Sequence, residues 1–199
     1  MFNLTELILS SGYLALFLTL FAETGLLFGF FLPGDTLLFT AGVLASKNIL
    51  NIHLLLLISF IAVVIGDSFG YYLGKKIGKK IFENNHFLDT YLNPENLEKS
   101  KKFFKKHGNK SIFFARYVPI IRTITPTLAG TAEMHYPSFL IYNILGGLTW
   151  VFSIVLAGYL LGNLIPNSVE IMTGIIILII LASIALPPIL HRKSKKQKN

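Results

Sequence analysis

The sequence predicts an all-helical polytopic membrane protein made of a single domain with two inverted repeats, and three observations lead to this fold class. Of the 199 residues, 53% are apolar and only 14% are charged, whereas a soluble domain is usually about a quarter charged. The charged residues gather in a few segments and leave long uncharged runs between them. Finally, two short motifs recur at one constant offset, each after an apolar segment that prolines interrupt.

The uncharged runs predict three membrane-spanning helices, because a span needs about 20 predominantly apolar residues. Residues 48–74 carry one charge, Asp67. Residues 136–161 carry none, and residues 170–190 carry only Glu170, at their first position. The sequence has no cysteine, which excludes disulfide frameworks, iron–sulfur centres and thiol catalysis.

The distribution of basic residues predicts the orientation in the membrane. Ten of the 18 Lys and Arg lie in the segment 75–110, and five more lie in the tail, residues 191–199. Both segments are therefore expected in the cytoplasm, the first containing an amphipathic helix at the membrane surface. Contact with anionic lipid accounts for the net charge of +8, so no nucleic-acid partner is expected. These charges do not determine on which side of the membrane the N-terminus lies. Nor do they determine whether the protein forms a homo-oligomer.

Two further apolar segments, 12–46 and 111–132, are broken by proline and by charge. The predicted breaks fall at Pro33, Gly34, Pro119 and Pro126. Since proline removes an amide donor and interrupts a helix, neither segment forms one regular helix through lipid. Broken backbone at membrane depth must be packed in protein or line a watery cavity. We therefore expect each segment to be a re-entrant hairpin, which enters and leaves on the same side.

An internal repeat supports this arrangement. Ala41-Gly42 recurs 88 residues later as Ala129-Gly130, and Gly70-Tyr-Tyr-Leu-Gly74 recurs at the same offset as Gly158-Tyr-Leu-Leu-Gly162. One hairpin plus one span crosses the membrane an odd number of times, so two such units in tandem are inverted. Inverted repeats with discontinuous helices are typical of transporters.

The two predicted hairpins carry opposite charges, which predicts a shared polar site. Glu23 and Asp35 lie in the first hairpin, and Arg116 and Arg122 lie in the second. A charge left unpaired in the bilayer centre costs about 2.5–3.5 kcal/mol, so these side chains are expected to meet. Guanidinium groups suit phosphate oxygens, and a buried carboxylate carries a proton readily. The hypothesis is that the arginines, with Thr123, bind a lipid phosphate while the two acids carry protons.

Asp67 lies apart from this group in the sequence, inside the span 48–74, and is a further candidate with either a structural or a functional role. His53 and His135 lie at span ends without a second ligand four residues on, so no metal site and no cofactor are expected.

The ordered motifs resemble the DedA family, which belongs to the superfamily of VTT-domain proteins. The resemblance covers residues 12–165 and rests on the strings Glu23-Thr-Gly, Gly-Phe-Phe-Leu-Pro33-Gly34-Asp35-Thr36, Gly66-Asp67-x-x-Gly70-Tyr71, Phe114-Ala-Arg116-Tyr-Val-Pro119-x-x-Arg122-Thr123, Ala129-Gly130 and Asn143-x-x-Gly146-Gly147-x-x-Trp150. Glu133 stands where the family usually has a small residue, and Ile124 stands where it often has phenylalanine.

This resemblance implies a bacterial inner-membrane protein with two opposed re-entrant hairpins and a lipid-translocating role. The lipid is undecaprenyl phosphate for some members and phosphatidylethanolamine for others, and proton dependence is proposed in the family. The acidic pair that the family requires corresponds to Glu23 and Asp35, and its arginine pair corresponds to Arg116 and Arg122. The two departures from the family pattern weaken a choice between the lipids.

Three other functions compete with that of a lipid carrier. An intramembrane aspartyl protease needs two aspartates that share a proton, for which Asp35 and Asp67 are the candidates, but it has no use for two arginines. A lipid-phosphate phosphatase would need a histidine beside the arginines, and neither arginine has one nearby in the sequence. A membrane chaperone or scaffold without transport activity is the main alternative, since a cluster of ion pairs also fastens helices together. We do not expect the protein to be an enzyme.

Overall fold

The computed structural model describes residues 4–26, 32–84 and 110–164, and every regular element within these ranges is an α-helix. The all-helical class that the sequence predicts is therefore confirmed for this part of the chain. The helices are α1 (Leu4–Gly25), α2 (Gly34–Ser46), α3 (Ile52–Asn84), α5 (Lys110–Ala115), α6 (Pro119–Thr131) and α7 (Tyr136–Leu164). Three predicted segments lie outside the described residues: the third span (170–190), the tail (191–199) and most of the basic loop.

The two longest helices, α3 and α7, are each long and apolar enough to cross a membrane, over Ile52–Lys76 and Tyr136–Leu164. At 1.5 Å per residue, 25 residues extend about 37 Å, more than the hydrocarbon thickness of about 30 Å. Helix α3 continues to Asn84, ten residues beyond the predicted end of the span at residue 74. The lysines of this extension favour helix, and nothing requires a helix to end where the lipid does.

The outward faces of both long helices are apolar. Large hydrophobic side chains are exposed at helical spacing on α3 (Leu54, Leu57, Ile61, Ile65 and Phe69) and on α7 (Ile141, Leu145, Leu148, Phe152, Leu156 and Leu160). An apolar surface of this extent is rare on soluble monomers. It matches the hydrocarbon of a bilayer, where such side chains cost nothing to expose.

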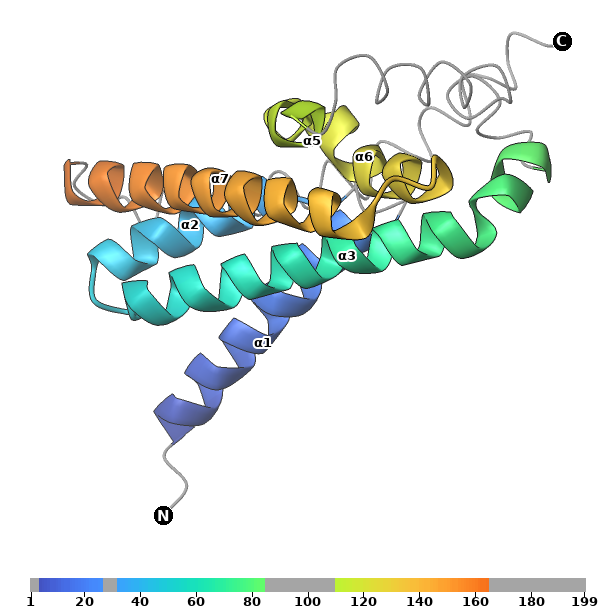
Figure 1. Cartoon of the computed structure of the whole chain (residues 1–199). Coiled ribbons are helices and arrows are strands. Elements are labelled where there is room, and N and C mark those ends of the chain that lie inside the picture. The colour runs from blue at the N-terminus through green and yellow to red at the C-terminus, as the bar shows by residue number, and fades with distance from the viewer. Residues whose placement is uncertain (1–3, 27–31, 85–109, 165–199) are drawn as a thin grey trace, which may run out of the picture.

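Each broken segment packs on the long helix that follows the other broken segment. Helix α2 lies along α7, and α6 lies along α3, while α3 and α7 run in opposite directions (Figure 1). Glycines allow the close approach: a Cβ on Gly42 would meet the carbonyl oxygen of Val155, and one on Gly130 would overlap that of Tyr71. The Ala-Gly pair of each segment thus contacts the long helix that follows the other segment.

The predicted breaks are found at three of the four residues. Pro33 precedes α2, which begins at Gly34, and Pro119 stands in the first turn of α6. Val118 before it has an extended backbone (φ −110°, ψ 110°), as steric contact with a following proline favours. Pro126 was predicted as a break and this is wrong, because it lies inside α6. It is buried there, and its ring lies 3.4 Å from where a Cβ on Gly70 would stand, so packing on α3 compensates for the missing backbone hydrogen bond.

The glycine contacts give a first testable prediction. Gly130→Ala is expected to lower the free energy of unfolding in detergent by about 1–3 kcal/mol, since the added methyl group overlaps backbone that cannot rotate away. Gly12→Ala is the matched control, because a Cβ added there would meet nothing within 4 Å. Equal thermal unfolding temperatures for the two variants would contradict the close contact of α6 with α3.

Candidate functional site

The charged residues of interest stand at the interruptions of the broken segments. Glu23 lies in the last turn of α1 and Asp35 in the first turn of α2, on either side of the first interruption. Arg116 directly follows α5, and Arg122 lies one turn inside α6, on either side of Pro119. The backbone breaks therefore place these four side chains at or near the ends of helices.

Arg122 binds both acids of the first segment. Its Nη1 donates to Oδ1 of Asp35 at 2.6 Å, and its Nη2 donates to Oε1 of Glu23 at 2.5 Å. The guanidinium carbon also lies 4.5 Å from the centre of the Trp150 ring on α7, a distance typical of a cation–π contact. One arginine thus joins α1, α2, α6 and α7, as a planar group with several donors can.

Gly34 makes room for this arrangement. A Cβ at Gly34 would overlap the carboxylate of Glu23, so a residue with a side chain at this position would push Glu23 away from Arg122. The glycine is needed here for close approach, and the proline before it starts the helix that carries Asp35.

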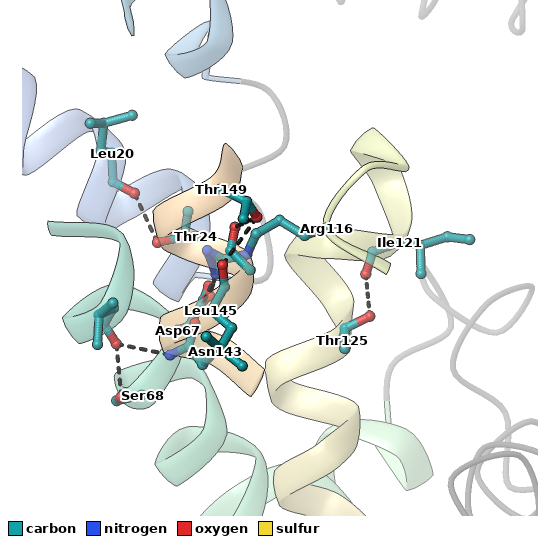
Figure 2. A network of polar contacts seen from close by, with 12 residues as sticks. Leu20, Thr24, Asp67, Ser68, Arg116, Ile121, Thr125, Asn143, Leu145 and Thr149 are labelled. Atoms are coloured by element: carbon teal, nitrogen blue, oxygen red, sulfur yellow. Dashed lines mark hydrogen bonds and ion pairs between the residues drawn. The ribbon is translucent and has the colours of Figure 1, made fainter. Parts of the chain in front are cut away.

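Arg116 has a different partner. Its Nη2 forms an ion pair with Oδ2 of Asp67 on α3 and donates to Oδ1 of Asn143 on α7 at 2.8 Å. Asn143 is held in turn by donating to the carbonyl oxygen of Val64 at 3.2 Å. Figure 2 shows Asp67, Arg116 and Asn143 pointing toward one another from three segments. The sequence set Asp67 apart from the charged group, and the structure corrects this by placing it against Arg116.

The two arginines line one small cavity. Thr24, Val63, Asp67 and Trp150 complete its wall, and about 10 Å³ is open to the centre of a water-sized sphere. This is room for about one water molecule and too little for a phosphate group. This cavity, as the described residues form it, is therefore too small for a lipid headgroup.

Three buried polar atoms of the charged residues have no hydrogen-bond partner within the described part of the chain: Oε2 of Glu23, Nη1 of Arg116 and Nε of Arg122. Unpaired buried donors and acceptors are costly, so they indicate where a water molecule or a ligand would bind. Two of the three are guanidinium donors, which call for an oxygen acceptor.

Solvent reaches the acids unequally. The side chain of Asp35 is 43% exposed, whereas that of Glu23 is 4% exposed and that of Arg122 is 7% exposed. Three carboxylates face two guanidinium groups, so the formal charge of the cluster is −1. Asp35 is the point at which this cluster opens to the outside.

Other predicted residues are placed as follows. Thr123 is buried on α6 next to Arg122 in the sequence. Asp35 and Asp67 pair with different arginines, an arrangement unlike the shared proton of a protease dyad. His53 and His135 are exposed, and the described residues contain no group of three or more His, Asp or Glu that could hold a metal.

Sequence reasoning from chemistry alone missed Asn143 and Trp150 as members of the site. Both are buried, and each contacts one of the arginines. A signal was present, because residues 143, 147 and 150 are spaced four and three apart and therefore share one face of a helix. Without the partner helices, nothing in that spacing indicates which charges this face meets.

Comparison with known proteins identifies the family. The family model of the VTT domain matches residues 32–160. The chain is 41% identical to protein DedA of Escherichia coli K12 over 92% of this chain and 86% of that protein. It is 40% identical to an uncharacterised membrane protein of Mycobacterium leprae over 83% of this chain and 74% of that protein.

A further relative, the inner membrane protein YqjA of Escherichia coli K12, is 33% identical over 76% of this chain and 68% of that protein. No solved structure matches the chain. The apolar helices, the order of the motifs and these relatives agree, and the chain belongs to the DedA family of VTT-domain membrane proteins.

Proposed function

We propose that this protein carries a phosphate-bearing lipid across the bacterial inner membrane, undecaprenyl phosphate first and phosphatidylethanolamine second, without chemical conversion. The observation that carries the proposal is that two buried arginines face one cavity, each held by carboxylate oxygens. Carboxylate and phosphate oxygens are alike as acceptors for guanidinium donors. The acids therefore act as internal substitutes for a phosphate.

The pairing gives a physical reason for coupling to protons. A phosphate that binds Arg122 displaces Glu23 and Asp35, since these acids occupy both Nη atoms. Glu23 is then a buried carboxylate without a partner, and a buried unpaired charge is neutralised rather than tolerated. Binding of the lipid phosphate thus draws a proton onto Glu23, and release of the lipid returns it. Thr123 adds a hydroxyl next to Arg122 on α6.

The proposed arrangement in the membrane has two opposed re-entrant hairpins, α1–α2 and α5–α6, related by an inverted repeat. The antiparallel course of α3 and α7 supports it, and so do the glycine contacts of α2 with α7 and of α6 with α3. Helix breaks that meet near the midplane are suited to a substrate site. The exposed lysines Lys75 and Lys76 at the end of the α3 span favour a cytoplasmic position for that end, and the tail 191–199 is placed on the same side.

The small cavity implies a second conformation. Because it has room for about one water molecule, a headgroup enters only when the two hairpins separate. Separation breaks the ion pairs of both arginines, and the phosphate replaces them. The closed form keeps the arginines neutralised between cycles.

Transport in liposomes tests the proposal. Labelled undecaprenyl phosphate and labelled phosphatidylethanolamine are placed in one leaflet, and movement is followed with and without a pH gradient. The intact protein is expected to speed the movement of at least one lipid, and Arg116→Ala and Asp35→Asn are expected to remove most of the gain. Lys47→Ala serves as control, because this lysine is exposed at the end of α2.

Movement of neither lipid with the intact protein would refute the proposal. Equal rates for the intact protein and both site variants would refute the role of the site.

A further inference from the structure

The ion pair between Arg116 and Asp67 has no part in the proton coupling described above. We propose that Asp67 is a second proton-binding carboxylate: it occupies on Arg116 the place that the lipid phosphate takes, and it must bind a proton before the phosphate bridges both arginines. This inference rests on the proposed function and concerns the same site.

The geometry of Arg116 separates a fixed contact from a replaceable one. Its Nη2 contacts both Asp67 and Asn143, and Asn143 is itself held by the backbone of Val64. The contacts through Asn143 involve uncharged groups and persist when Asp67 leaves. Its Nη1 is buried with no partner among the described residues, and Arg116 lines the cavity together with Arg122. When its carboxylate partner is lost, Arg116 keeps its contact with Asn143, and the Nη2 hydrogen that faced Asp67 becomes free beside the unpartnered Nη1.

Burial makes Asp67 unable to stay charged alone. Asp67 is 4% exposed and Arg116 is 7% exposed. The charged groups that face Asp67 are Arg116, after α5, and Arg122, on α6, which lines the same cavity. Arg122 is itself engaged by Glu23 of α1 and Asp35 of α2. Helix α7 contributes the uncharged Asn143 and Trp150, so nothing else among the described residues replaces Arg116 as a cation for Asp67.

The number of buried acids that lose a guanidinium partner gives the number of protons. Three carboxylates and two guanidinium groups sum to −1. A phosphodiester adds a further −1, so the sum becomes −2, and two protons bring it to zero. Glu23 and Asp67 are the buried acids and take them, whereas the side chain of Asp35 is 43% exposed and takes no proton in this scheme. One phosphodiester is thus bound together with two protons.

The lone tryptophan of the sequence, Trp150, provides the measurement, since it lies in the cavity wall against Arg122. The full-length protein in detergent is titrated with short-chain phosphatidylethanolamine and, in parallel, with farnesyl phosphate, and Trp150 fluorescence reports binding. Proton uptake is counted with a pH indicator in weak buffer. Two bound protons make the affinity fall about a hundredfold per pH unit, and one makes it fall about tenfold.

The expected result is an uptake of two protons per phosphatidylethanolamine for the intact protein and one for Asp67→Asn, with the pH slope reduced accordingly. For farnesyl phosphate, whose own phosphate titrates, the difference between the two proteins is again one proton. Glu133→Gln is the matched control, because Glu133 is an exposed acid after α6, and it is expected to behave as the intact protein. Asp67→Glu, which keeps the carboxylate, is expected to retain two protons.

Three outcomes overturn the inference. Uptake of fewer than two protons per phosphatidylethanolamine by the intact protein contradicts the inference without any variant. This outcome therefore does not depend on whether a variant folds. Equal uptake by the intact protein and Asp67→Asn also contradicts it and leaves the carrier function standing. Absence of binding of both probes to the intact protein overturns the proposed function together with this inference.

Discussion

Arg122→Lys is expected to reduce lipid transport about tenfold to a hundredfold while the protein still folds. Lysine keeps the positive charge, but it has one nitrogen instead of a planar group that reaches Asp35, Glu23 and the Trp150 ring at once. A hydrogen bond to a charged group is worth about 1.5–3 kcal/mol, and losing one such bond to the phosphate accounts for this range. The initial rate of lipid movement in liposomes is the measurement.

The comparison with Lys47→Arg controls for a change between the two basic side chains at an exposed position. Thermal unfolding in detergent shows whether Arg122→Lys remains folded, so that lost transport is assigned to the site. Full transport by the folded variant would show that charge alone suffices, and the proposed need for a planar guanidinium group at this position would then be wrong.

Arg116→Met is expected to destabilise the protein by about 3–5 kcal/mol, the cost of leaving a buried charge without its partner. Asp67 is the charge left behind, since its carboxylate forms an ion pair with Arg116 and both are buried. Adding Asp67→Leu removes that charge, and the double variant is expected to recover most of the lost stability. Transport is expected to stay absent in both variants, because the phosphate donor at this position is gone.

This double variant separates a carrier from a scaffold. If the ion pairs only fasten helices together, a double variant that is stable again restores whatever the protein does. The readouts are the free energy of unfolding and lipid movement, with the single variant Asp67→Leu measured alongside. Recovery of both stability and transport would contradict the carrier role of Arg116 and favour a structural one.

Much of the helix architecture was predictable because it depends on local chemistry. The uncharged runs around residues 48–74 and 136–161 became α3 and α7, and Pro33 and Pro119 mark the starts of α2 and α6. Pro126 shows the limit of this reasoning. A proline inside a helix is destabilising in isolation, yet here it is buried against Gly70 of a helix that is far away in the sequence.

The sequence by itself determined which side chains must avoid lipid and where the helices are interrupted, since both follow from the cost of a buried charge and of a missing amide donor. Only the tertiary structure decided the partners. Arg122 takes both Glu23 and Asp35, and Arg116 takes Asp67. This choice depends on which helices cross and how closely, and glycine contacts between distant segments set that distance. The four-residue spacing of glycines in the recurring motifs indicates that another helix packs closely there, but the spacing does not indicate which helix it is.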